Sequence, residues 1–283
     1  MIQYKSNMVT IAIPIYNAES FLRDAIQSVL NQTYRGWTLF LVNDGSTDGS
    51  LSIMQEFAAL DSRIRIINDG ENKGLVARLN QSIALADTKY YARMDADDIM
   101  YVTRIEEQVR FLEANPNVDV LGTSIMTIDA DNNIIGSGLS VGQVESFIHP
   151  TVMGRTEWFR NNHYSEKMVR AEDFELWLRT CKNSEFRSLG QPLLFYREFG
   201  VPTLKKTLKS QQTIIKVFCH YKVYNKSLFW CLKNVVITLI KMGIYIIFSI
   251  IGCSNYIVRK RNRIPVPAEE CLSIKDLQDS IKK

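Results

Sequence analysis

Residues 9–30 read VTIAIPIYNAESFLRDAIQSVL, a short apolar run followed by a stretch with helical spacing. Val9 to Tyr16 is a strand candidate, and Asn17 can cap a helix whose apolar residues recur about every 3.6 positions. The alternation then continues, with strand candidates at 39–42, 64–67 and 90–94 and helix candidates at 51–58 and 74–86. Such a series predicts an α/β fold in which helices cover a mostly parallel sheet.

Beyond Met100 the pattern is less regular. The sequence predicts a helix at 104–114, short strands at 118–121 and 125–128, a helix at 172–181 and a strand at 192–196. The regular strand–helix series is therefore confined to about the first hundred residues.

The composition excludes several classes of protein. A chain of 283 residues with 46% hydrophobic residues is neither disordered nor a small disulfide scaffold. Its five cysteines are odd in number and widely spaced, which supports neither a zinc site nor a disulfide framework. The N-terminus lacks the pattern of a signal peptide, so we expect a reducing, cytosolic setting.

Charge is distributed unevenly along the chain. Residues 1–200 carry 19 Lys+Arg and 26 Asp+Glu, or −7, whereas residues 201–283 carry 15 and 4, or +11. The tail is also apolar: Met242 to Val258 is 17 residues without a formal charge, about 26 Å as a helix and marginal for a bilayer core of roughly 30 Å. The C-terminal segment thus combines cations with long apolar runs.

The pattern of this tail predicts attachment to a membrane surface. Lys226, Lys233 and Lys241 fall within about 80° of one another on a helical wheel, as in a helix that lies in a membrane interface. Basic residues flank the apolar run, with Arg259 to Arg263 following it, so a single span would oppose the positive-inside tendency. A monotopic or re-entrant attachment satisfies both clusters, and a helix packed on the rest of the protein is the alternative.

Three carboxylates stand in RMDADD, residues 93–98, directly after a strand candidate. Carboxylates this close repel one another, and a divalent cation such as Mg²⁺ or Mn²⁺ would relieve that cost while bridging to a diphosphate. A solvated acidic turn is the alternative. The carboxyl end of a strand favours the ligand site, because ligands of open α/β sheets gather there.

Two further strand ends point to the same edge of the sheet. Residues 14–17, PIYN, close the first strand, and residues 43–48, NDGSTD, close the second. Either alone is typical of a capped turn, but together with the acidic cluster they form a rim able to hold a base, a ribose and a diphosphate. The chain has neither G-x-G-x-x-G nor a P-loop motif, which disfavours those modes of nucleotide binding.

Five ordered motifs give the chain a family resemblance. IPIYN (13–17), NDGSTDGS (43–50), NKGLVARLN (72–80), RMDADD (93–98) and AEDFELWLR (171–179) resemble those of the family 2 inverting glycosyltransferases, across roughly residues 8–200. The resemblance implies a GT-A, Rossmann-like fold, a nucleotide-sugar donor, most often a UDP-sugar, and Mn²⁺ or Mg²⁺ as cofactor.

By position, the resemblance also implies roles for individual residues. Pro14, Tyr16 and Asn17 would line the base pocket, Asp44 would bond the uracil, Asp95 would face the ribose and sugar, Asp97 would coordinate the metal and Asp173 would be the catalytic base. Inverting transfer needs a base on the acceptor hydroxyl opposite the leaving diphosphate, and Glu172 is the rival of Asp173 for that role.

Four further residues are weaker site candidates. Lys73 and Arg78 would place cations near the diphosphate, with a solvated face as the alternative. His149 and Trp177 would lie near the donor or acceptor, with a structural histidine and a core tryptophan as the alternatives. The Q-x-x-R-W motif of processive members is absent, which favours transfer of a single sugar.

These expectations combine into one interpretation. Residues 1–204 would be the GT-A catalytic domain, with a donor half to about residue 100 and an acceptor half after it, and residues 205–283 a helical tail bound to an anionic membrane. The enzyme, of the hexosyltransferase type (EC 2.4), would act at the cytoplasmic face of the cell membrane on a lipid-linked or growing surface glycan. The alternative is a catalytically silent nucleotide-sugar-binding scaffold.

Binding of nucleic acid is disfavoured, because the lysines of the tail alternate with aliphatic runs. The identity of the sugar, the linkage and the oligomeric state stay open.

Overall fold

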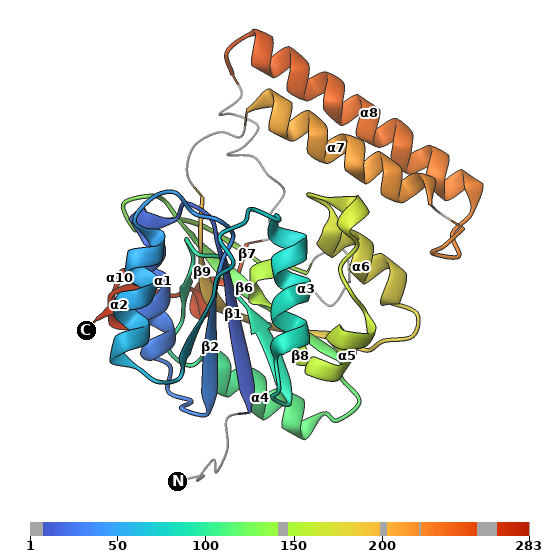
Figure 1. Cartoon of the computed structure of the whole chain (residues 1–283). Coiled ribbons are helices and arrows are strands. Elements are labelled where there is room, and N and C mark those ends of the chain that lie inside the picture. Colours follow the sequence, from blue (N-terminus) through green and yellow to red (C-terminus); the bar gives the residue numbers. More distant parts are fainter. Residues whose placement is uncertain (1–7, 141–146, 199–202, 221, 254–264, 283) are drawn as a thin grey trace. The chain divides into compact units, whose positions relative to one another are not determined.

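A computed structural model describes residues 8–140, 147–198, 203–220, 222–253 and 265–282. The chain divides into two compact units (Figure 1). The first unit comprises residues 1–163, 183–198 and 264–283, and the second comprises 164–182 and 199–263. This division differs from the one expected at residue 204, because the C-terminal segment returns to the first unit.

A parallel sheet forms the first half of the first unit. Its strands are β1 (Val9–Ile15), β2 (Trp37–Asn43), β3 (Ile64–Ile67) and β4 (Tyr90–Arg93), in the order β3-β2-β1-β4. Val9 lies opposite Trp37 on one side and Tyr90 on the other. The predicted α/β series is confirmed.

Helices cover both faces of these strands: α1 (Glu19–Leu30), α2 (Ser50–Leu60), α3 (Leu75–Leu85) and α4 (Arg104–Ala114). Alternate β1 residues such as Ile11 and Ile13 share one core with α1, α2 and α4. On the other face, Ser82 of α3 bonds the Tyr91 hydroxyl at 2.7 Å. Successive side chains of a strand point to opposite faces, and β1 and β2 are buried almost throughout because helices cover both faces.

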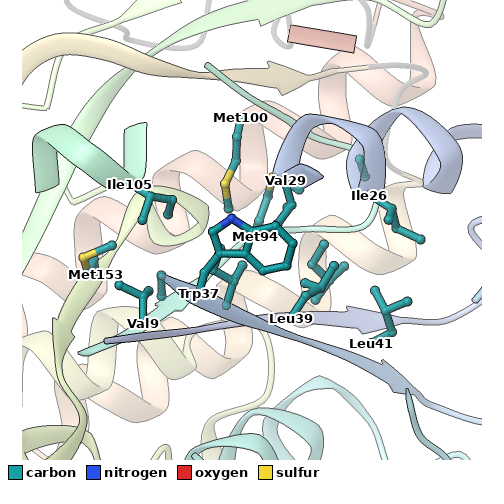
Figure 2. Packing of buried hydrophobic residues seen from close by; sticks show 14 of the residues in the cluster. Val9, Ile26, Val29, Trp37, Leu39, Leu41, Met94, Met100, Ile105 and Met153 are labelled. Atoms are coloured by element: carbon teal, nitrogen blue, oxygen red, sulfur yellow. The ribbon is translucent and has the colours of Figure 1, made fainter. Parts of the chain in front are cut away.

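The main core is built around Trp37, at the start of β2. Figure 2 shows its ring among side chains that include Val29 of α1, Ile105 of α4 and Met94, which directly follows β4. Trp37 is fully buried and Arg63 lies 3.7 Å over its ring. This core fixes β1, β2 and β4, whose carboxyl ends form the candidate site.

The second half of the sheet mixes directions, in the order β8-β6-β9-β5 after β4. Its elements are β5 (Ile99–Met100), β6 (Val120–Ile128), β7 (Ile134–Gly138), β8 (Met153–Arg155), β9 (Phe186–Arg197), α5 (Thr156–Asn161) and the short helix η2 (His149–Thr151). β6 and β9 are parallel, whereas β8 is antiparallel to both β4 and β6.

Two predicted strand boundaries in this half were wrong. The strands expected at 118–121 and 125–128 form one strand, β6, because its central Thr123 and Ser124 are buried and hydrogen bonded. The Thr123 amide donates to Thr151 Oγ1 at 3.0 Å, and Ser124 Oγ accepts from the Ser140 amide at 3.0 Å. β9 is likewise longer than the strand expected at 192–196.

The second unit contains α6 (Glu172–Thr180), α7 (Leu204–Cys219), α8 (Leu228–Ile250) and the short helix η3 (Glu166–Met168). α8 includes Lys233 and Lys241 together with the first part of the uncharged run that begins at Met242. By length and composition alone, it is long and apolar enough to cross a membrane. Residues 254–258 of the predicted apolar run and the basic cluster Arg259–Arg263 lie outside the described residues.

The C-terminal segment closes the first unit through η4 (Ala268–Glu270) and α10 (Ile274–Ile281). Ser273 and Asp276 form a capping box at the start of α10. Leu277 is buried among Ile99, Ile128 and Phe195. The sequence analysis assigned this segment to the membrane tail, whereas the structure packs it on the sheet.

Candidate active site

The candidate site lies where β1 and β4 part. β2 and β3 lie on one side of β1, and β4, which comes later in the chain, lies on the other side. The point between β1 and β4 is therefore a topological switch point of the sheet. On the side of β2, the Ile15 carbonyl accepts from the Asp44 amide at 2.7 Å. On the side of β4, the Ala12 carbonyl accepts from the Met94 amide at 3.2 Å. Pro14 therefore faces β4 without an N–H to donate, and the ladder to β4 has ended by Ala12.

The loop after β1 is tied to the loop after β2. Asn17 adopts a left-handed conformation, with φ of 51°, and its Oδ1 accepts from the Thr47 amide at 2.8 Å. The expected capping of α1 by Asn17 was wrong, because Asp48 Oδ2 accepts from the Glu19 amide at 3.0 Å instead. Tyr16, at 55% exposure, presents its side chain to solvent beside this joint.

Asp44, at the end of β2, is buried and holds the loop at residues 72–74. Its Oδ1 accepts from Lys73 N at 2.7 Å and from Arg78 Nε at 2.9 Å, and its Oδ2 accepts from Gly74 N at 3.0 Å. Since a carboxylate oxygen has two lone pairs, Oδ2 keeps capacity for one more donor.

Gly45 makes this close approach possible. Its φ is +69°, and an added Cβ would lie 2.8 Å from the Asn72 amide nitrogen. Only glycine meets both requirements without strain.

Arg78 is fully buried, and all five of its N–H groups have acceptors. They are Asp44, Asp69 twice, Gln81 Oε1 and the Glu71 carbonyl. The predicted contact of Arg78 with a diphosphate would require one of these bonds to break. Lys73 is 45% exposed and pairs with Asp69 and Glu71, and the hydrogen bond to Asp69 raises the pKa of Lys73.

The acidic turn follows β4. Asp95 forms an ion pair with Arg93, and Asp98 is fully buried, with Oδ1 accepting from the Arg197 amide at 2.9 Å. Burial raises the pKa of Asp97, although Arg197 and Arg93 oppose the shift. Burial, together with the neighbouring Asp97 charge, raises the pKa of Asp98 well above its usual value.

Three arginines surround this turn: Arg93, Arg104 and Arg197. Arg197 Nε donates to the Asp97 carbonyl at 2.8 Å, and its guanidinium lies 4.5 Å over the Phe21 ring. Burial lowers the pKa of Arg104 to about 9, and the charge of Asp98 opposes that shift. The arginines thus offset much of the carboxylate repulsion from which a metal was predicted. The sequence analysis named neither Arg104 nor Arg197 as a site residue.

His149 is buried in the first unit, at the start of η2. Burial lowers the pKa of its imidazole well below the usual value, and the charge of Arg93 adds to the effect. The imidazole is therefore neutral near pH 7.

The remaining predicted residues lie on α6 in the second unit. Asp173 is the second residue of α6, and its Oδ1 accepts from the Phe174 amide at 2.8 Å. Glu172 and Trp177 are buried. The unit that carries the rim does not include this helix.

A family model described as Glycosyl transferase family 2 matches residues 10–187, which include all four parallel strands and the acidic turn. The chain belongs to this family. An uncharacterized glycosyltransferase of Haemophilus influenzae is 30% identical over 216 residues, 69% of this chain and 67% of the relative. A putative glycosyltransferase of Bacillus subtilis, EpsE, is 36% identical over 183 residues, 60% of this chain and 66% of the relative. The chain thus spans about two thirds of the length of these relatives.

Solved structures have folds similar to that of this family 2 glycosyltransferase. S. aureus TarS 1-349, in complex with UDP-GlcNAc, superposes with a TM-score of 0.64 at 13% identity, over 82% of this chain and 71% of the other. The mannosyltransferase PcManGT from Pyrobaculum calidifontis, in complex with GDP-Man and Mn²⁺, gives 0.58 at 16% identity, over 85% and 76%. The expected GT-A fold is confirmed.

A divalent cation suits the acidic turn of this glycosyltransferase. The Asp95 carboxylate is 34% exposed, and among the described residues Asp98 Oδ2 is buried without a hydrogen-bond partner. Hard oxygen ligands of this kind are those that Mg²⁺ and Mn²⁺ prefer. The residues present therefore fit the cofactor that the family implies.

Proposed function

We propose that this glycosyltransferase transfers one sugar from a UDP-sugar to a lipid-linked or growing surface glycan, with inversion at the anomeric carbon. The observation that carries the proposal is the rim at the β1/β4 switch point, where Asp44 at the end of β2 and the acidic turn after β4 lie on either side of β1. The family and a structural neighbour solved with UDP-GlcNAc support the donor class.

The donor would lie along this rim. Tyr16 offers an exposed aromatic face for the base, next to Pro14 and Asn17, and Asp44 Oδ2 accepts the imide N–H of uracil. Lys73 contributes a cation near the diphosphate. Arg78 acts indirectly, because it orients Asp44 and the loop that carries Lys73.

The acidic turn would bind the rest of the donor. Asp95 faces the ribose and sugar, and Asp97 holds Mn²⁺ or Mg²⁺, supported by the neighbour solved with Mn²⁺. When bound, the cation supplies positive charge beside the leaving diphosphate. His149, as a neutral imidazole, serves as a hydrogen-bonding contact rather than a cation.

The second unit would contribute the base. Asp173 takes the proton of the acceptor hydroxyl as the new oxygen–carbon bond forms and the bond from the anomeric carbon to the diphosphate breaks. Glu172 and Trp177, on the same helix, would border the acceptor. The diphosphate leaves with the electron pair, so charge and protons balance.

Turnover of a panel of UDP-sugars with Mn²⁺ or Mg²⁺ tests the proposal. Asp97→Ala should abolish metal-dependent turnover, and Asp173→Asn should lower it by about 100-fold or more while UDP binding persists. Asp87→Asn, at an exposed position outside the site, is the matched control.

Full activity in both site variants would contradict the proposal. Stabilisation of the wild-type chain by UDP, without turnover of any donor, would instead favour the silent scaffold.

A further inference from the structure

An apolar stripe runs along α8 on the side that no described element covers. Six of its side chains are more than half exposed: Phe229, Leu232, Val236, Ile240, Ile247 and Ile250. At about 100° per residue, these positions fall within an arc of about 80°, and no charged residue lies inside it. The stripe follows the helix over most of its 23 residues, about 34 Å.

The opposite side of α8 packs on α7 within the second unit. Cys231 and Thr238, seven residues apart, are the buried α8 positions. Phe218 of α7 and Trp230 of α8 make an edge-to-face contact, with ring centroids 5.2 Å apart. The α7 contact therefore uses a different face and leaves the stripe exposed.

The charge around the stripe has one sign. Residues 203–253 contain eight lysines and neither Asp nor Glu. Lys205, Lys206, Lys209 and Lys216 are exposed on α7, and Lys233 and Lys241 are exposed on one flank of the stripe. An apolar stripe with lysines along one flank, in a helix pair without acidic residues, complements an anionic lipid surface.

The chain path limits how such a helix can meet a bilayer. Glu198 ends one segment of the first unit, and residues 265–282 form the next, packed on the same sheet. Asn31 Nδ2 donates to the carbonyls of Ser280 and Lys282 at 2.9 and 2.7 Å, which secures that return. Both ends of the intervening segment are thus on one side of any membrane, so the segment crosses it an even number of times.

Among the described residues, α8 is the one helix long and apolar enough to cross a membrane, so none there can pair with it as a second crossing. α7 has 16 residues, about 24 Å, and carries four lysines. The return from residue 254 to residue 264 includes Arg259, Lys260, Arg261 and Arg263, each costly in hydrocarbon. A spanning α8 would also place the charged side chains of Lys233 and Lys241 in the membrane, which is unfavourable.

We infer that α8 lies in the plane of an anionic membrane surface. Its stripe enters the boundary between headgroups and acyl chains, and its flanking lysines contact lipid phosphates or carboxylates. The helix docks without spanning, so the first unit and both ends of the α7–α8 pair stay on one side.

Vesicle flotation with the full chain tests the docking. The protein should float with vesicles containing about 30% phosphatidylserine, and binding should fall at least tenfold on pure phosphatidylcholine or when salt is raised from 0.05 to 0.5 M. The double variant Ile240→Asp, Ile247→Asp should lose at least tenfold in binding. Leu60→Asp, at an even more exposed apolar position of the first unit, should bind like the wild type. Equal binding of all three would overturn the inference.

A labelling experiment separates lying from spanning. A variant that keeps Cys253, just after α8, with the other four cysteines changed to Ser, is added to the outside of sealed anionic vesicles. A membrane-impermeant maleimide should label Cys253 fully without detergent. Protection until detergent is added would establish a span and overturn the inference.

A second copy of the chain is the competing occupant of the stripe. The membrane assignment would be overturned if the wild type is a dimer in vesicle-free buffer and does not float with vesicles, and if the Ile240→Asp, Ile247→Asp variant is a monomer. None of these readouts needs a nucleotide-sugar, so their failure is distinguishable from the failure of the proposed transferase activity.

Discussion

Arg78 connects two carboxylates that the sequence could not place together. Its guanidinium, with no exposed surface, bonds Asp44 at the end of β2 and Asp69 after β3. The bidentate contact with Asp69 depresses the pKa of that carboxyl group. Arg78 therefore fixes the 72–74 loop against the donor rim, and its effect on binding should be indirect.

Replacing Arg78 by Met should destabilise the protein and weaken UDP binding together. Removing one partner of a buried pair costs about 3–5 kcal/mol, because the Asp44 charge stays buried. Urea unfolding and titration calorimetry with UDP would measure the two effects. Arg65→Met, an exposed arginine on neighbouring β3, is the control and should change neither. A loss of UDP affinity at unchanged stability would show that Arg78 contacts the donor directly.

His149 should make stability depend on pH. Its folded-state pKa lies well below the unfolded value of about 6.5, so only the unfolded chain takes up a proton between these two values. This contribution to stability is complete above about pH 6.5 and is lost as pH falls toward the folded pKa. Thermal unfolding between pH 5 and 8 measures this loss. The wild type and His220→Asn, a control at an exposed position, should lose stability as pH falls, and the stability of His149→Gln should depend less steeply on pH. Parallel slopes for all three would contradict the assignment.

At the scale of elements, α10 completes the core beneath the acidic turn. Leu277 packs with Ile99 of β5, which follows Asp98 directly, and with Phe195 of β9, two residues before Arg197. The last helix thus braces both strands that hold the turn.

Leu277→Ala should lower the free energy of unfolding by about 2–5 kcal/mol, through lost burial and the cavity left behind. Ile274→Ala, at a position 53% exposed on the same helix, should cost less than about 1 kcal/mol. Urea unfolding measures both. Similar losses in the two variants would indicate that α10 contributes through helix propensity rather than through core packing.

At the scale of the molecule, the proposed base and the proposed membrane surface share the second unit. Ala171 directly precedes α6, and Leu178 lies near the end of α6. Both belong to one buried cluster with Val217 of α7 and Tyr224, which follows α7. Docking of α8 would therefore also hold the base helix at the membrane, which favours an acceptor carried by a lipid.

A lipid-linked acceptor in anionic vesicles should accordingly react at least about tenfold faster than its water-soluble headgroup at equal concentration. The Ile240→Asp, Ile247→Asp variant should lose this advantage while donor hydrolysis in solution is unchanged. Steady-state kinetics of both acceptors measure the ratio. Equal rates for the two acceptors in the wild type would contradict the coupling.

Local patterns were enough to predict the four parallel strands and their helices. β1 and β2 are short apolar runs rich in β-branched and aromatic residues and bounded by turn residues, and their alternation with helical segments predicts the α/β class and the edge that carries the site. Boundaries failed where buried polar side chains are hydrogen bonded at long range, as for Thr123 in β6. The assignment of Asn17 as a cap also failed because of a long-range hydrogen bond, since its exposed side chain bonds the Thr47 amide, 30 residues away.

By itself the sequence determined the fold class, the family and the rim, because these depend on periodicity and on motifs that are contiguous in the chain. Only the tertiary structure decided that Arg78 is fully engaged, that arginines offset the acidic turn, and that the last helix returns to the sheet. The physical reason is that each depends on contacts between residues far apart in the sequence. The proposed orientation of α8 on a membrane also depends on such a contact, the one between Asn31 and Ser280.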